Sequence, residues 1–417
     1  MRGKFATPRS KLEVLDEIRR TFGKPIRAAS APGRADFLNT HQDYKGLPVV
    51  PVAVNLRTYA VAIEELPDRF EVISLNMKRE GRAHTESFAL NPKLEGKGVF
   101  GDYLRACVIA LRGNGFSIKS GLKIVIDSDV PVGAGLGSRA ALEVAFIKLL
   151  DTHYGLKLGK DQLAELAFKA ENEIMRIPCG RLDQYGSSYG GAILLYTKLP
   201  VQVEELPLSN VNFAIADSGI KHRVASIHPV RQAEIELGLS QLLELDDLPV
   251  KIKRLLGRKY WEPKWEELRL EELNPYLNEI DEKAAKRIRF TLLMHRLTLL
   301  ALKLIKTRSL TLSELEEIGS KVDATFLEIL GAIIDKQHEL LRDLYEVSLP
   351  ELENIREAML NAGAYGAKIS GAGLGGALIA LVDEQTGRKV AEEAVNAGAY
   401  RSFLARVDEG AREEGLW

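Results

Sequence analysis

A glycine-dense loop that runs directly into an expected helix is the segment of this chain best suited to bind phosphate. The loop reads VPVGAGLGSRAALE over residues 130–143 and follows an alternating, strand-like LKIVI segment. Gly133, Gly135 and Gly137 can adopt positive φ, which lets backbone N–H groups approach an anion closely. The helix expected from Arg139 adds unpaired N–H groups and the positive end of its dipole. The order strand, glycine loop, helix therefore predicts a phosphate site.

A second glycine cluster, KISGAGLGGA at residues 368–377, contains a formal Gly-x-Gly-x-x-Gly. A dinucleotide-binding loop of that type opens a helix, whereas the apolar run that follows here, ALIALV, is typical of a strand. We therefore interpret the segment as a loop between two strands and exclude a dinucleotide-binding fold. No Gly-Lys pair in the chain has the Walker A frame, which argues against a P-loop nucleotide hydrolase.

Two further segments concentrate groups that could act in acid–base or anion chemistry. The segment APGRADFLNTHQDY, at residues 31–44, holds a fixed cation, an imidazole and two carboxylates: Arg34, Asp36, His41 and Asp43. The other segment is PCGRLDQYG at residues 178–186, in which Asp183 follows Glu171, on an expected helix, by twelve positions. One such carboxylate alone is typically a solvated surface charge. The two charged segments and the two glycine loops together favour a functional site over ordinary turns.

The four segments, in this order and at these separations, resemble the GHMP superfamily of small-molecule kinases and, within it, the galactokinases. The resemblance rests on GRADFLNTHQDYKG, VPVGAGLGSRAALE, PCGRLDQYG and KISGAGLGGA, and it spans about residues 26–400. It implies an α+β fold of two domains with the active site in the cleft between them. The N-terminal α/β domain, of the ribosomal S5 domain 2-like type, is expected over residues 1–204. A ferredoxin-like domain with a helical insertion is expected over residues 205–417.

The resemblance also implies ATP-dependent phosphorylation of a sugar hydroxyl, which in galactokinases is the anomeric one. By motif, Asp183 would take the proton from that hydroxyl and Arg34 would lie beside it. The physical chemistry agrees, because an ionised carboxylate within hydrogen-bond reach can activate an alcohol during phosphoryl transfer. A guanidinium nearby would keep that carboxylate ionised and offset the charge of the transferring group.

The same resemblance assigns the remaining site residues in three sets. The sugar-contacting positions are Thr40, His41, Asp43, Gly180 and His228. The ATP-binding positions are Gly133, Gly135, Gly137, Ser138, Arg139, Gly371, Gly373 and Gly375. The Mg²⁺ ligands would be Glu171 and Ser138, since magnesium prefers few protein oxygens, with phosphate and water completing its shell.

Three positions depart from the galactokinase pattern. Thr40 stands where galactokinases usually carry a glutamate that contacts the C6 hydroxyl of the sugar, and His228 stands where they carry a tyrosine. Arg139 replaces a serine in the run that normally offers a magnesium-binding hydroxyl. Arginine cannot ligate a cation, so we hypothesise that Arg139 supplies part of the charge neutralisation and leaves Glu171 as the main protein ligand; in the alternative interpretation, it is a surface residue.

The sequence leaves several functions open. The first is a sugar-1-kinase for galactose or for a related hexose, amino sugar, pentose or uronate. The second is a catalytically weak sensor of sugar and ATP on the same scaffold, which Arg139 would favour. Retention of Arg34, Glu171 and Asp183 favours the enzyme, because a protein that only binds needs no proton acceptor. A mevalonate- or homoserine-type kinase is a third interpretation, although it would not need the His41-x-Asp43-Tyr44 block.

The whole chain sets wider limits. Its 417 residues carry a formal net charge of −1 with 46% hydrophobic residues, so neither a nucleic-acid partner nor a membrane partner is expected. Its two cysteines, Cys107 and Cys179, lack a metal-like spacing, and no long apolar segment is present, so we expect a cytoplasmic protein. The expected partners are a small-molecule sugar and ATP, and the oligomeric state stays open.

Apolar spacing predicts the elements that must position these residues. Helices are expected at 9–22, 99–114, 139–153, 160–175, 230–245, 281–306, 312–341 and 349–362. Strands are expected within 26–88, near 191–196 and 211–216, and as a strand–loop–strand unit at 365–383. The stretch 197–208 is expected to link the domains.

Overall fold

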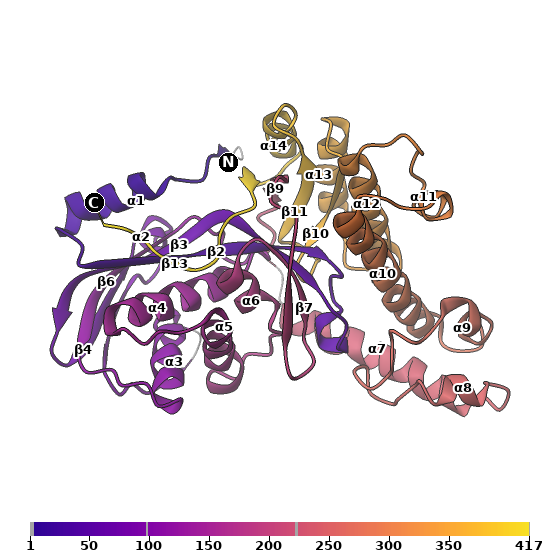
Figure 1. The fold of residues 1–417 in the computed structure, drawn as a ribbon, viewed down its shortest axis with the longest axis horizontal. Coiled ribbons are helices and arrows are strands. Elements are labelled where there is room, and N and C mark those ends of the chain that lie inside the picture. The colour runs from indigo at the N-terminus through magenta and orange to yellow at the C-terminus, as the bar shows by residue number, and fades with distance from the viewer. Residues whose placement is uncertain (1–3, 97–98, 222–223, 417) are drawn as a thin grey trace.

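The computed structural model describes residues 4–96, 99–221 and 224–416, which form two sheets and a helical arm (Figure 1). The larger sheet has the strand order β13-β2-β3-β6-β4-β5, and β7 extends from β3 to β8. Its strands are β2 (Arg27–Leu38), β3 (Val50–Leu66), β4 (Arg69–Ser74), β5 (Thr85–Ala89), β6 (Gly121–Ser128), β7 (Ala192–Tyr196), β8 (Gln202–Leu206) and β13 (Arg412–Glu413).

Helices cover the larger sheet because its strands and helices share an apolar interior. Leu104, Val144 and Leu163 of three helices lie in one buried cluster with Ile124 of β6. The helices of this part are α1 (Lys11–Phe22), α2 (Leu75–Arg79), α3 (Phe100–Gly113), α4 (Ser138–Tyr154), α5 (Lys160–Phe168) and α6 (Leu182–Tyr189), with a π-helical turn at Lys169–Ile174. The predicted helices at 9–22, 99–114, 139–153 and 160–175 are confirmed, the last as α5 plus this turn.

The smaller sheet has the order β1-β12-β9-β11-β10, with antiparallel pairing throughout except for the parallel β1. Without β1 and the helices inserted between β9 and α13, the order is strand, helix, strand, strand, helix, strand, which is the ferredoxin-like arrangement. Its elements are β1 (Lys4–Ala6), β9 (Asn212–Asp217), α13 (Pro350–Asn361), β10 (Gly366–Ser370), β11 (Ala377–Val382), α14 (Gly387–Asn396) and β12 (Arg401–Arg406). The strand–loop–strand unit expected at 365–383 is confirmed as β10, a glycine loop and β11.

Strand β9 holds the two sheets together because both of its faces are buried. Phe213 and Ile215 lie in one cluster with residues of the larger sheet, and the Phe213 ring packs edge-on against Phe37 at 5.5 Å. The alternate residues Ala214 and Ala216 belong to a second cluster with α13 and α14. Because successive residues of a strand face opposite sides, β9 contributes to the cores of both sheets. The end of β10 lies against β2, which carries Arg34 and Asp36.

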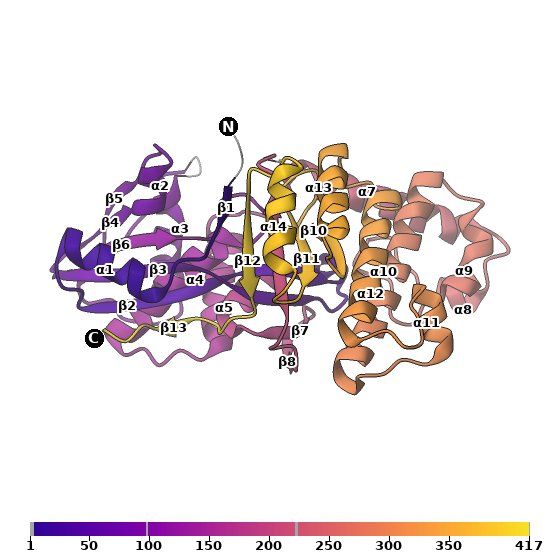
Figure 2. The same ribbon diagram turned by 90° about the horizontal axis from the view of Figure 1, so that it is seen from above.

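The two chain ends cross between the sheets, as both views show (Figures 1 and 2). Strand β1 pairs with β12 of the smaller sheet, and β13 pairs with β2 of the larger one. The domain boundary expected at residue 204 stays a prediction. Each sheet contains one strand from the opposite end of the chain. The terminal strands therefore tie the two parts to each other.

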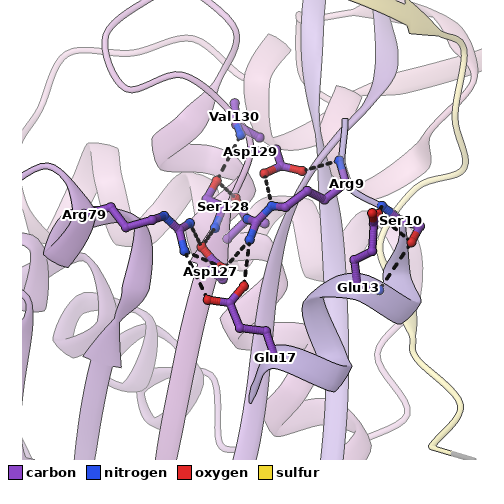
Figure 3. A network of polar contacts seen from close by, with 10 residues as sticks. Arg9, Ser10, Glu13, Glu17, Arg79, Asp127, Ser128, Asp129 and Val130 are labelled. Carbon is purple, nitrogen blue, oxygen red and sulfur yellow. Dashed lines mark hydrogen bonds and ion pairs between the residues drawn. The ribbon is translucent and has the colours of Figure 1, made fainter. Parts of the chain in front are cut away.

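An arginine from the N-terminal segment fixes the base of the first glycine loop (Figure 3). Arg9 donates from Nε to Oδ1 of Asp129 (2.8 Å) and from Nη1 to Oδ2 of Asp127 (2.7 Å). Arg79 contacts the other oxygen of Asp127, whose side chain is fully buried. Because Asp127 and Asp129 stand at the end of β6, this network holds the strand where the loop begins.

A helical arm, inserted between β9 and α13, extends from the smaller sheet (Figure 2). It contains α7 (Val224–Glu244), α8 (Val250–Lys253), α9 (Leu270–Leu277), α10 (Glu282–Thr307), α11 (Leu312–Ile318) and α12 (Phe326–Asp343). Trp265 is buried in its core, whereas Trp261 is half exposed. The helix expected over 312–341 is wrong in one respect: it ends at Gly319, which has φ +71°, and restarts at Phe326.

The segment expected to link the two domains is more than a simple connection. The stretch 197–208 contains strand β8, which pairs with β7 in the larger sheet. Its alternating residues are mostly exposed, so the apolar pattern that marks a strand is weak there. Within the described residues, no helix is both long and apolar enough to cross a membrane.

Candidate active site

The two glycine loops, more than 230 residues apart in the chain, lie against each other. Gly133, Gly135 and Gly137 have φ values of +77°, +74° and +70°, the conformation expected of a phosphate-binding loop before a helix. A Cβ on Gly135 would lie 2.4 Å from the carbonyl oxygen of Ser370, and one on Gly371 would lie 3.1 Å from the Cα of Gly135. Only glycine permits this contact, so the smaller sheet closes one side of the loop.

Arg34 and Asp183 form an ion pair beside this loop. Arg34, on β2, donates from Nε (3.0 Å) and Nη2 (2.5 Å) to Oδ1 of Asp183 in the first turn of α6. Its Nη1 donates to the carbonyl oxygen of Gly135 at 2.5 Å. Gly137 completes the junction, because a Cβ there would lie 3.3 Å from Cγ of Arg34 and 3.7 Å from Oδ2 of Asp183. The guanidinium is buried and the Asp183 side chain is 31% exposed, so this carboxylate is open to a small molecule.

Asp43 and Gly180 meet although they come from different segments. A Cβ on Gly180 would lie only 2.1 Å from Oδ2 of Asp43, so the carboxylate occupies the space that a side chain would fill. Burial raises the pKa of Asp43 to about 6, and the carboxylates of Asp36 and Asp183 act in the same direction. Asp43 is therefore a buried acceptor that titrates near neutral pH and lies within electrostatic range of Asp183.

The titration of Asp43 gives a pH dependence that can be measured without turnover. If the ionised carboxylate accepts hydrogen bonds from sugar hydroxyls, its protonation below about pH 6 removes the acceptor. We expect the sugar dissociation constant, measured by calorimetry without nucleotide, to rise about fivefold between pH 6 and pH 5. In Asp43→Asn, binding should be weaker at neutral pH and flat over this range. A parent dissociation constant that does not change with pH would contradict this role.

An aromatic cluster surrounds His41. The ring of His41 lies 5.3 Å from that of His228 on α7 and 4.8 Å from that of Tyr345, and its Nε2 contacts the carbonyl oxygen of Ala372 at 3.1 Å. Burial lowers the pKa of His41 well below its usual value, with His228 acting in the same direction. Because a carbonyl oxygen only accepts, Nε2 of this neutral imidazole donates to Ala372, which leaves Nδ1 as a hydrogen-bond acceptor. Tyr44 and Tyr345 contact each other through their hydroxyls, and both rings pack against that of His41.

Thr40 faces a lysine of the smaller sheet. Lys368, on β10, is fully buried and donates from Nζ to Oγ1 of Thr40 (2.6 Å) and to the carbonyl oxygen of Asp36 (2.7 Å). Burial lowers the pKa of Lys368 to about 8, although the nearby Asp36 carboxylate opposes the shift. The hydroxyl of Thr40 is therefore engaged by an ammonium group, which the sequence alone did not indicate.

Glu171 is paired with the arginine that replaces a serine in the loop. Nε of Arg139 lies 3.0 Å from Oε1 of Glu171, and Gln184 donates from Nε2 to Oε2 at 2.9 Å. Burial raises the pKa of Glu171 to about 7, and Arg139 opposes this shift. Arg139 lies at the surface, with 46% of its side chain exposed, and nevertheless pairs with Glu171.

The family resemblance implies Mg²⁺, with Glu171 as the main protein ligand. Among the described residues, no three carboxylate, histidine or cysteine groups form a protein-held metal site. Magnesium that arrives on a triphosphate needs only one or two protein oxygens. Oε1 of Glu171 accepts no hydrogen bond within the described part of the chain, so it fits such an ion if Arg139 moves aside.

Removal of this arginine should strengthen metal binding. In Arg139→Ser, the buried Glu171 carboxylate loses its competing cation and regains a neighbouring hydroxyl. We expect Mn²⁺ to bind about tenfold more tightly in the presence of a non-hydrolysable ATP analogue, as measured by the loss of its free electron paramagnetic resonance signal. Arg112→Ser, on the exposed end of α3, makes the same charge change away from the site. Equal Mn²⁺ affinity in the parent and in Arg139→Ser would refute the competition.

The structure brings together most of the residues that the sequence singled out. Ser138 begins α4 at the loop, as expected. Gly373 and Gly375 instead pack away from the first loop: Cβ atoms there would lie 2.6 Å from the Val347 carbonyl oxygen and 2.5 Å from that of Ile220. Their part in ATP binding stays a prediction. Lys368 and Tyr345 also lie at the site, although the sequence indicated no role for them; the one available signal was a lysine within an otherwise apolar strand.

Comparisons with known proteins agree with this geometry. Residues 102–191 match the GHMP kinases N terminal domain, residues 315–400 match the GHMP kinases C terminal domain, and residues 18–63 match the galactokinase galactose-binding signature. The galactokinase of Thermococcus kodakarensis is 30% identical over 391 residues, which cover 91% of this chain and 98% of that protein. The galactokinase of Pyrococcus furiosus is 29% identical over 380 residues, covering 90% and 93%.

Solved structures share the fold. The crystal structure of Lactococcus lactis galactokinase complexed with galactose superposes with a TM-score of 0.74 at 24% identity, covering 96% of this chain and 98% of that one. Methanococcus jannaschii mevalonate kinase gives a TM-score of 0.63 at 20% identity, covering 93% and 99%. The two sheets, the paired glycine loops and these matches define a GHMP kinase, and the expected two-domain α+β fold is confirmed. Within that class, the chain belongs to the galactokinase family.

Proposed function

We propose that the protein transfers the γ-phosphoryl group of ATP to the anomeric hydroxyl of galactose. The observation that carries the proposal is the Arg34–Asp183 pair directly beside Gly137 of the phosphate loop. A proton acceptor next to a phosphate site is what phosphoryl transfer to an alcohol requires. The membership of the galactokinase family supports galactose and ATP as the substrates.

In the proposed reaction, the Asp183 carboxylate accepts the proton of the sugar hydroxyl. The hydroxyl oxygen forms a bond to the γ-phosphorus while the bond from that phosphorus to its bridging oxygen breaks, and ADP leaves. Arg34 holds Oδ1 of Asp183 in place through two hydrogen bonds and adds positive charge beside the transferring group. Backbone N–H groups of the loop and the start of α4 face the triphosphate and stabilise its negative charge.

Glu171 would hold a Mg²⁺ ion bound to the triphosphate. When bound, the ion would neutralise charge on the phosphate oxygens. On the sugar side, Asp43 would accept hydrogen bonds from hydroxyls, and His41 would accept one on Nδ1, because its Nε2 donates to the Ala372 carbonyl oxygen. Gly180 leaves the space in which the Asp43 carboxylate lies.

A sensor that binds without turnover is the second candidate, and the Arg139–Glu171 ion pair is the observation that favours it. This pair reduces the availability of the metal ligand but leaves the Arg34–Asp183 pair intact. Kinase activity therefore remains the better-supported function.

A screen of monosaccharides with ATP and Mg²⁺, read as ADP released, tests the proposal. We expect galactose to give ADP in a one-to-one ratio with a sugar phosphate whose phosphorus NMR coupling places it on the anomeric oxygen. Binding of sugar and nucleotide without ADP release from any sugar would favour the sensor. ADP release with another sugar but not with galactose would support the kinase chemistry and show that galactose is not the substrate.

A further inference from the structure

A buried polar cluster next to the Arg34–Asp183 pair has no role in the reaction as proposed. It consists of Asp36 on β2, Thr40 after β2 and Lys368 on β10. The ammonium group of Lys368 has three donors, of which two go to the Asp36 carbonyl oxygen and the Thr40 hydroxyl. A fully buried ammonium is unfavourable unless an opposite charge lies nearby. The carboxylate of Asp36 is that charge.

The Asp36 carboxylate is incompletely satisfied. The residue is only 6% exposed, and among the described residues its Oδ1 has no hydrogen-bond partner. A buried carboxylate oxygen without a donor is strongly disfavoured, so such an atom in a native fold indicates a missing partner. Burial raises the pKa of Asp36, while Lys368 and Arg34 act against the shift.

The position of Asp36 places this free acceptor at the centre of the site. Its backbone N–H donates to Oγ of Ser370 (3.0 Å), and that hydroxyl donates to the carbonyl oxygen of Gly135 (3.2 Å) in the phosphate loop. Its carboxylate lies within electrostatic range of both Asp183 and Asp43. The group therefore stands among the proposed base, the proposed sugar acceptor and the loop.

We propose that Asp36 determines sugar specificity by accepting a hydrogen bond on Oδ1 from one hydroxyl of the sugar. Lys368 and Thr40 are positioning residues: Lys368 holds the backbone of Asp36 and the Thr40 hydroxyl, and both groups act to stabilise the charged form of the carboxylate. The inference rests on the proposed function and narrows its substrate class to neutral sugars with a hydroxyl at this position. A uronate whose carboxylate faced Asp36 would meet like charge, which disfavours the uronate among the sugars that the sequence left open.

The substitution Asp36→Asn tests the assignment, because it keeps the shape and removes the charged acceptor. Its kcat and KM would be compared with those of the parent on galactose and on galactose lacking the hydroxyl at C2, C3, C4 or C6 in turn. We expect a rise in KM for galactose of about 10- to 100-fold with kcat within a few-fold. For one deoxy sugar, parent and variant should have nearly equal kcat/KM, since the partner hydroxyl is already absent.

Controls separate recognition from loss of structure. The dissociation constant for a non-hydrolysable ATP analogue and the thermal midpoint should stay near those of the parent in a folded variant. Thr40→Val, which leaves Asp36 intact, should give a smaller loss that vanishes on the same deoxy sugar. If Asp36→Asn fails to fold, the Thr40→Val comparison decides alone, and an equal loss on every deoxy sugar would overturn the inference.

The outcomes also distinguish this inference from the proposed function. A parent that phosphorylates none of the sugars refutes the function. If the parent phosphorylates galactose, and Asp36→Asn lowers kcat/KM equally on every analogue or on none, only the role of Asp36 is refuted. Faster turnover of galacturonate than of galactose by the parent would also overturn it.

Discussion

Asp183→Asn is expected to lower kcat by about 10³-fold while leaving the affinity for nucleotide within a few-fold of the parent. The amide keeps the size of the carboxylate, and its oxygen can still accept from Arg34, which now donates to Oδ1 through Nε and Nη2. An amide cannot take up the proton of a sugar hydroxyl. The measurement is ADP release at saturating sugar and ATP, together with calorimetric binding of a non-hydrolysable ATP analogue.

Asp161→Asn provides a matched control for this substitution. Asp161 is also an aspartate in the first turn of a helix, but it contacts the exposed hydroxyl of Tyr189 at 2.5 Å, away from the phosphate loop. Its kcat should equal that of the parent. Turnover retained in Asp183→Asn would exclude Asp183 as the base. A parallel loss of nucleotide affinity would show instead that the carboxylate shapes the loop.

Gly180→Ala is expected to raise the KM for sugar by about 100-fold or more. The added methyl group would lie 2.1 Å from Oδ2 and 3.2 Å from Cγ of Asp43, so the carboxylate must leave its position. Loss of a placed hydrogen-bond acceptor for hydroxyls discriminates by this amount or more in sites built around such contacts. The backbone of Gly180 does not lie in the left-handed region, so alanine adds no backbone strain and the effect is steric.

A double-mutant cycle isolates this contact. In an Asp43→Ala background the clash is absent, so Gly180→Ala should add little to the loss already caused by Asp43→Ala. Gly113→Ala, at the end of α3, is the control, because a Cβ there meets open space and the backbone is helical. KM and kcat are read by ADP release, and the thermal midpoint reports folding. Losses that simply add would show that Gly180 acts through something other than Asp43.

Features set by neighbouring residues could be predicted well from the sequence. The glycines at 133, 135 and 137 have the expected positive φ, because no other residue adopts it so readily. The loop at 371–376 joins two strands, as its apolar continuation indicated. The break between α11 and α12 at Gly319 and the exposed strand β8 were missed, since amphipathic periodicity is a weak guide where residues face solvent.

The sequence by itself determined the class of site: two phosphate-type glycine loops and a block of polar residues for a sugar. These features depend on residue types at short spacings, and the local backbone geometry follows directly from them. Only the tertiary structure decided the pairing of Lys368 with Thr40 across 328 positions, of Arg139 with Glu171, and of Asp43 with the space at Gly180. The first contact follows from how the two sheets pack through β9, and the other two from how helices and loops pack on the larger sheet; this packing depends on the whole apolar core rather than on any one segment.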